Sequence, residues 1–245
     1  MLKHSLKLDY RNFKRFTNSF FINLIGLSTG LACALFIFLW VNDEVNMNTF
    51  HEKSERLYQV MEHQQYADDI MTTVSTPGLL AESLKEEIPE VEYAATTTWI
   101  NSNTLSIEDK NISARGYYVG TDFFNIFSFE LIQGNADLVL SEKSNIVISE
   151  ELALKLFDTT QDIIGRQVEF QHDKVFQVSG VFAGTPKNSS LQFEYVMSFE
   201  EFKDINDWVL NWGSNGPRTF VILNEGADAK AVSDKIADFV TEKGQ

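Results

Sequence analysis

Cysteine is almost absent from this 245-residue chain. Its single cysteine, Cys33, lies inside an uncharged apolar segment, so residues 43–245 contain no cysteine that could form a disulfide. A domain of about 200 residues can be stabilised by its hydrophobic core alone. The absence of disulfides therefore fits a bacterial periplasm better than a small secreted scaffold.

Sequence patterns for catalysis or metal binding are missing as well. None of the four histidines, His4, His51, His63 and His172, stands at metal-ligand spacing from another. The chain has no GxxxxGK[ST] phosphate loop, no GxSxG nucleophile motif and no HExxH zinc motif. We therefore expect no catalytic residue, no metal, no cofactor and no enzyme activity.

Charge is distributed unevenly along the chain. Residues 16–42 carry no charged side chain, whereas residues 43–245 carry 15 Lys and Arg against 34 Asp and Glu, a net charge of −19. This acidity argues against nucleic acid or anionic headgroups as partners of that part. With only four prolines and 13 glycines the chain also has no low-complexity linker, so we expect a folded domain.

The uncharged segment is long enough to cross a membrane. As a helix that rises ~1.5 Å per residue, residues 20–41 would extend about 33 Å, which exceeds the roughly 30 Å of a hydrocarbon layer. A cleavable signal has a shorter apolar region and a small-residue cleavage site, but this segment ends in Trp40, Val41 and Asn42. A buried core helix rarely runs so far without a polar face. We predict a transmembrane helix over residues 18–42.

The residues before this helix indicate its orientation. Residues 1–17 are predicted to form a basic amphipathic helix, and residues 1–15 have a net charge of +4. Basic residues beside a membrane span stay in the cytoplasm, so residues 43–245 should lie in the periplasm of a bacterial inner-membrane protein. The leader either directs topology alone or also contacts a cytoplasmic partner. The residues concerned are Lys3, Lys7, Arg11, Lys14 and Arg15.

Small residues recur at a spacing of four within the apolar segment. Gly26 and Gly30 form a GxxxG pattern, and Ala34 continues it. Small side chains allow two helices to approach closely in lipid. We predict that these three residues pack against another transmembrane helix, while the rest of the surface contacts membrane lipid.

The remainder of the chain predicts an α+β, or mixed α/β, domain, because short strands alternate with three helices. The helix predicted over residues 79–88 has Thr76 as its cap candidate, a second follows Ser149, and a third spans residues 228–240. We also expect the membrane helix to continue for a few turns beyond Asp43. Strands are expected at residues 55–65, 91–100, 103–107, 112–119, 129–133, 145–149, 167–171, 175–182, 193–197 and 219–223.

Several stretches resemble the permease subunits of MacB-type ABC transporters, with a MacB-like periplasmic core domain and an FtsX-like permease region. The segment at residues 46–60 is similar to the family pattern D-x-F-H…R-I-Y-R-V, although Asn48 stands where the family often has Asp. The resemblance continues through four further stretches in the family's order: residues 123–134, 146–157, 164–166 and 181–189.

The resemblance implies a non-catalytic permease subunit. A partner cytoplasmic ABC ATPase subunit would hydrolyse ATP, and paired permease protomers would transmit the movement to the periplasmic domains for export or mechanotransmission. Periplasmic or outer-membrane components are further expected partners. Family members continue into at least three more transmembrane helices, so the resemblance implies either an N-terminal fragment, with a periplasmic domain over residues 43–245 that is incomplete at its C-terminal end, or a remainder encoded elsewhere.

A different class of function also fits the sequence. A single-pass anchored interaction or sensor domain without transport would account for the one membrane helix. It would leave the order of the matched stretches unexplained. The aromatic stretch at residues 123–129 is interpreted as domain core in both cases, because clustered phenylalanines are typical of a packed interior.

Overall fold

The computed structural model describes residues 17–66 and 69–244. The chain divides into two compact units, residues 1–48 and residues 49–245. The first unit contains the helix α2 (Thr17–Val45), whose apolar stretch has a mean hydropathy of 2.3 and no buried side chains. By length and composition this helix could span a membrane. The predicted leader helix lies outside the described residues, apart from Thr17.

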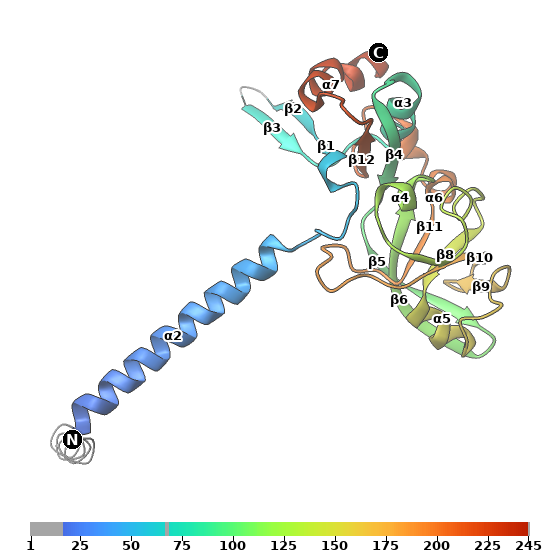
Figure 1. The fold of residues 1–245 in the computed structure, drawn as a ribbon. Helices are drawn as coiled ribbons and strands as arrows, with labels where there is room; N and C mark the ends of the chain where they lie inside the picture. The colour runs from blue at the N-terminus through green and yellow to red at the C-terminus, as the bar shows by residue number, and fades with distance from the viewer. Residues whose placement is uncertain (1–16, 67–68, 245) are drawn as a thin grey trace. The chain divides into compact units, whose positions relative to one another are not determined.

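The second unit is built on a ten-stranded sheet (Figure 1). Beginning at one edge, its main path is β1 (Leu57–Val60), β12 (Arg218–Leu223), β4 (Val91–Thr97), β6 (Lys110–Val119), β11 (Tyr195–Ser198), β8 (Asn145–Ser149), β10 (Lys174–Phe182), β9 (Gln167–Phe170) and β5 (Asn101–Ile107).

The far end of this sheet curls back on itself. β5 pairs with β9 and also with β6, so the strands from β6 to β5 close into a ring. Within it, β11 runs parallel to β6 and β8 runs parallel to β10, while β7 (Leu131–Gln133) adds to β10 outside the ring. The sheet is therefore mixed, which confirms the predicted α/β class.

Helices and one separate hairpin complete the unit. The hairpin consists of β2 (Glu62–Tyr66) and β3 (Asp69–Thr73). The helices are α3 (Leu80–Glu87), α4 (Phe123–Ile126), α5 (Glu150–Phe157), α6 (Phe199–Ile205), α7 (Ala229–Lys235) and α8 (Phe239–Lys243), with short 3-10 turns at Ser54–Arg56 and Asp207–Leu210.

Three apolar clusters form most of the core. One lies where α3, α7 and α8 cover β1, β12 and β4, and a second lies where α5 packs on the ring. The third surrounds α4 and contains most of the buried phenylalanines. Burial of these apolar side chains is the main favourable contribution to folding.

Local patterns predicted several elements correctly. The β5–β6 and β9–β10 hairpins turn where the polar breaks were expected, with Ile107 opposite Lys110 in the first. Ser149 caps α5, since its Oγ accepts a hydrogen bond from the Leu152 amide at 3.2 Å. In α3, the predicted inner face is buried at Leu80 and Leu84.

Three predictions of helical structure were wrong. The apolar helix α2 ends at Val45 instead of continuing for a few turns past Asp43. Thr76 does not cap α3, because its buried hydroxyl is paired with the hydroxyl of Thr219 at 2.8 Å. The expected helix over residues 228–240 is broken into α7 and α8, which lets both Val232 and Phe239 face the core.

Candidate functional site

The surface of α2 is open at the predicted packing positions. Apart from the neighbouring helix backbone and the adjoining residues, a Cβ atom built on Gly26 or Gly30 would meet no atom of the described residues within 4 Å. Ala34 is also exposed. Another helix could therefore approach this face closely, which is how small residues promote association in lipid. The packing role of these residues stays a prediction, and the basic residues Lys3, Lys7, Arg11, Lys14 and Arg15 lie outside the described residues.

The second unit begins with a junction segment, residues 49–57, that is anchored by both ring contacts and polar contacts. His51 is only 7 % exposed, and the centre of its ring lies 4.0 Å from that of Phe50 and 5.4 Å from that of Phe127. Its Nδ1 accepts a hydrogen bond from the Ser128 amide at 3.2 Å. The junction is thus packed into the domain at Phe50 and His51.

Burial sets the protonation state of His51. Loss of water around the imidazole lowers its pKa from the ordinary value of 6.5, so the ring is neutral at pH 7. Because Nδ1 accepts from an amide, the hydrogen-bond network assigns the ring proton to Nε2. A neutral His51 can pack among the aromatic rings without an uncompensated charge.

The next residues of the junction bind main-chain groups of the aromatic stretch. The Glu52 amide donates to the Ser128 hydroxyl at 2.9 Å, and Lys53 Nζ donates to the Asn125 carbonyl at 3.0 Å. The Lys53 ammonium also lies 4.4 Å from the centre of the Tyr93 ring, a cation–π distance. These contacts tie the segment to α4, to the turn after it and to β4.

Arg56 links the end of the junction to the sheet. One guanidinium nitrogen, Nη1, lies 2.5 Å from a carboxylate oxygen of Glu92 and 2.7 Å from the carbonyl oxygen of Leu223. Glu92 belongs to β4 and Leu223 to β12. Charge-assisted hydrogen bonds of this kind are among the stronger polar contacts in proteins. The junction is therefore held at both ends.

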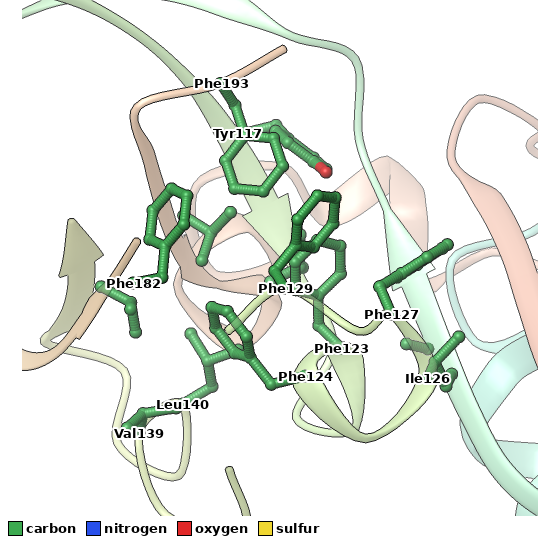
Figure 2. Close-up of a cluster of buried hydrophobic side chains, with 14 of the residues drawn as sticks. Tyr117, Phe123, Phe124, Ile126, Phe127, Phe129, Val139, Leu140, Phe182 and Phe193 are labelled. Atoms are coloured by element: carbon green, nitrogen blue, oxygen red, sulfur yellow. The ribbon is translucent and has the colours of Figure 1, made fainter. Parts of the chain in front are cut away.

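The aromatic stretch beneath the junction is part of a packed cluster of rings (Figure 2). Phe129 meets Phe193 edge to face at 4.9 Å, and Phe193 meets Tyr117 in the same way at 5.1 Å. Phe123 lies 5.0 Å from Phe127 and is fully buried. This confirms the prediction that the stretch is domain core. Tight ring packing makes it a firm anchor for the junction.

Sequence reasoning identified the junction only through its family resemblance. It did not reveal that His51 is buried, because Ser128 is 77 residues away in the chain. It also missed the contacts of Lys53 and Arg56 for the same reason. Among the described residues no group of three or more His, Cys, Asp or Glu side chains could hold a metal ion.

Comparison with known proteins places this architecture in a family. A family model described as the MacB-like periplasmic core domain matches residues 20–239. No match was found among curated proteins. The family match covers the apolar helix from residue 20, the junction and nearly all of the second unit.

Solved structures share the fold. A domain of a protein from Porphyromonas gingivalis that is assigned as a permease is 24 % identical, with a TM-score of 0.64, over 80 % of this chain and 84 % of that one. The periplasmic region of MacB from Actinobacillus actinomycetemcomitans is 14 % identical, with a TM-score of 0.55, over 81 % and 86 % of the two chains.

A third similar structure comes from Gram-positive bacteria. It is the extracellular domain of the noncanonic ABC-type transporter YknZ, with 15 % identity and a TM-score of 0.54 over 76 % of this chain and 94 % of that one. These similarities concern the fold, whereas the family match extends into the apolar helix. The chain belongs to the family of proteins that contain a MacB-like periplasmic core domain.

Proposed function

We propose that the chain is a non-catalytic permease subunit of an ABC transporter. A partner ATPase in the cytoplasm hydrolyses ATP, and the subunit couples that hydrolysis to movement of its periplasmic domain for export or mechanotransmission. The observation that carries the proposal is the family match across residues 20–239, which includes the apolar helix together with the domain. One solved relative is itself named an ABC-type transporter.

The junction segment supports a mechanical role. Motion of the membrane helix reaches the domain through residues 49–57, and a loosely attached segment would absorb that motion. Here the side chains of His51, Lys53 and Arg56 bind the aromatic stretch and two strands. Close-packed interiors are stiff, so displacement of the junction is passed on to the domain.

The residues of the apolar helix and of the leader take specific roles in this proposal. Gly26, Gly30 and Ala34 pack against a second permease protomer or further transmembrane helices. The basic residues of the leader keep the N-terminus in the cytoplasm, near the ATPase. Residues 1–17, 18–42 and 43–245 are then the cytoplasmic leader, the inner-membrane helix and the periplasmic domain, which in turn can meet periplasmic or outer-membrane components.

The partner ATPase is the part of the proposal most open to direct test. The gene in its native chromosomal setting would be given an affinity tag, and the protein would be purified from membranes in mild detergent and analysed by quantitative mass spectrometry. A permease subunit brings down one ATPase in stoichiometric amount. A single-pass sensor or interaction domain brings down none, and that result would overturn the proposal.

A topology measurement separates two ways of failing. A periplasm-active reporter fused after residue 245 is active if the domain lies outside the cytoplasm. Activity with no ATPase would point to the anchored sensor domain. Inactivity would contradict the orientation itself, which rests on the net charge of +4 in residues 1–15.

A further inference from the structure

The strand β1 leaves one edge of the large sheet open. It pairs with β12 on one side only and ends the strand order. The Leu57 amide bonds to the Ser54 carbonyl and so points away from β12. Since main-chain groups alternate in direction along a strand, the amide and carbonyl of Gln59 face the same open side.

The side chains of this short edge strand do not protect it from pairing. Proteins commonly blunt edge strands with proline, lysine or other charged side chains, which discourage pairing with another chain. β1 consists of Leu57, Tyr58, Gln59 and Val60, and none of these is charged or a proline. An unprotected edge is suited to pairing with an added strand.

A groove runs beside the open edge. Its volume is about 420 Å³, and its lining residues come from β1, β12, the β2–β3 hairpin and the helices α3, α7 and α8. Figure 1 shows β1, the hairpin and α7 at the same end of the unit. Cavities of roughly 300 to 1,000 Å³ are typical of ligand sites. Apolar side chains form much of its lining: Val60, Leu80, Val221, Val232, Ile236 and Val240.

Two polar atoms in the lining residues have no partner. Gln59 Nε2 and Glu62 Oε2 are both buried, and neither makes a hydrogen bond within the described part of the chain. Burial of an unpaired donor or acceptor is unfavourable, so a group that satisfies either atom gains affinity. One atom donates and the other accepts, which matches the carbonyl and the amide of a peptide.

We propose that this groove binds an extended segment of a partner protein, which adds a strand to the free edge of β1 and places apolar side chains in the groove. The main-chain groups of Gln59 pair with the segment, and the side chains of Gln59 and Glu62 satisfy peptide groups beside it. An added strand of four residues, which rises ~3.3 Å per residue, would be as long as the four-residue strand β1. Glu62 is the only carboxylate among the described residues that line the groove, so a basic residue next to the segment is favoured.

Binding can be measured with a defined probe. The chain in lipid nanodiscs would be titrated against fluorescein-labelled Lys-Thr-Val-Ile-Val-Thr-amide, with fluorescence anisotropy as the readout. The control peptide has the same side chains but carries methyl groups on alternate backbone nitrogens, which remove the donors needed for strand pairing. The proposal expects saturable binding of the first peptide and binding about tenfold or more weaker for the second.

Matched variants locate the binding site. Ser233→Trp introduces a large side chain into the groove from α7, whereas Ala231→Trp places it at an exposed position of the same helix outside the lining. The first variant should weaken peptide binding about tenfold or more, and the second should leave it unchanged. Gln59→Met should weaken binding roughly threefold to tenfold through loss of one donor.

Three results would overturn the proposal. The first is the absence of saturable binding by the unmodified peptide to the unmodified chain. The second is equal binding of the two peptides together with displacement by lauric acid, which would make the groove a site for apolar molecules. The third is equal behaviour of Ser233→Trp and Ala231→Trp. The proposal concerns the second unit alone, so ATPase purification tests a separate claim.

Discussion

Replacement of Arg56 by methionine tests the anchoring of the junction. The change keeps most of the apolar length of the side chain and removes its contacts with Glu92 Oε2 at 2.5 Å and Leu223 O at 2.7 Å. The Arg56 and Glu92 side chains are 25 % and 32 % exposed, so this ion pair is neither fully screened nor fully buried.

The expected loss follows from these two contacts. Exposed ion pairs contribute ~0.2–1 kcal/mol, and hydrogen bonds to charged groups contribute ~1.5–3 kcal/mol before any discount for solvent. We therefore expect Arg56→Met to lower the free energy of unfolding by about 2 kcal/mol. For a domain of this size that corresponds to a melting temperature roughly 4–8 °C lower.

Urea denaturation of residues 49–245, followed by tryptophan fluorescence, would measure this loss. Residues 49–245 form a compact unit of their own, which supports the use of this fragment. A double-mutant cycle with Glu92→Gln isolates the ion pair, for which we expect a coupling of about 1 kcal/mol.

The exposed pair Lys110–Asp158 provides the control. Its side chains are 41 % and 81 % exposed, so Lys110→Met should cost less than about 0.5 kcal/mol. If Arg56→Met cost no more than this control, the idea that Arg56 anchors the junction would be refuted.

Three further predictions address His51, the aromatic core and the membrane helix. Because burial lowers its pKa, His51 contributes stability that is complete above pH 6.5 and is lost as the pH falls through its folded-state pKa. The loss amounts to at most about 1.4 kcal/mol per pH unit. His51→Asn should reduce this pH dependence of the free energy of unfolding, measured by denaturation between pH 7.5 and 5. Tyr117 buries a hydroxyl without a partner among the described residues, so Tyr117→Phe should raise the free energy of unfolding by about 1 kcal/mol. Tyr195→Phe should instead lower it by about 1 kcal/mol, because the Tyr195 hydroxyl accepts a hydrogen bond from Asn103 at 2.7 Å. Gly26→Ile with Gly30→Ile should reduce co-purification with partner membrane helices several-fold, because close approach is blocked.

Each of these predictions has a result that would contradict it. An unchanged pH slope in His51→Asn would mean that another group dominates acid destabilisation. Equal effects of Tyr117→Phe and Tyr195→Phe would contradict the assigned hydrogen bonding. Unchanged co-purification of the Gly26 and Gly30 variant would remove the proposed packing role of these residues.

Much of the local structure was predictable because its causes are local. Hairpin turns such as that between β5 and β6 depend on a polar break between two apolar alternations, and the Ser149 cap bonds only three residues ahead. The apolar helix α2 follows from one continuous apolar run. In each case the deciding contacts lie within a few residues.

The order of strands could not be read in this way. β6 and β11 are neighbours in the sheet, although about 80 residues separate Gly116 from its partner Tyr195. Such pairings depend on tertiary packing, which strand propensity does not encode. The helix α6 was missed although its signals were present: Phe199 and Phe202 lie on one face, and Glu200 and Glu201 occupy its first turn.

The candidate sites could not be predicted from the sequence because they are formed by contacts between residues far apart in the chain. Lys53 and Arg56 of the junction bond to partners that lie 36 to 167 residues further along the chain, so no spacing in the sequence predicted these contacts. The groove beside β1 is similarly formed by residues near both ends of the second unit, such as Tyr58 and Thr241. Thr76 was predicted as a cap from its position just before α3. Its true partner, Thr219, is 143 residues away in the chain, so no local pattern indicated that contact.

The coupling of nucleotide binding to the periplasmic domain is the central claim. Hydrogen–deuterium exchange would be measured on the complex purified with its ATPase, with and without ATP and vanadate. The account predicts that exchange changes in the ATPase and also in residues 49–57 and 123–129, while the β9–β10 turn stays the same. Changes confined to the ATPase, with identical exchange in the junction and the aromatic stretch, would contradict it.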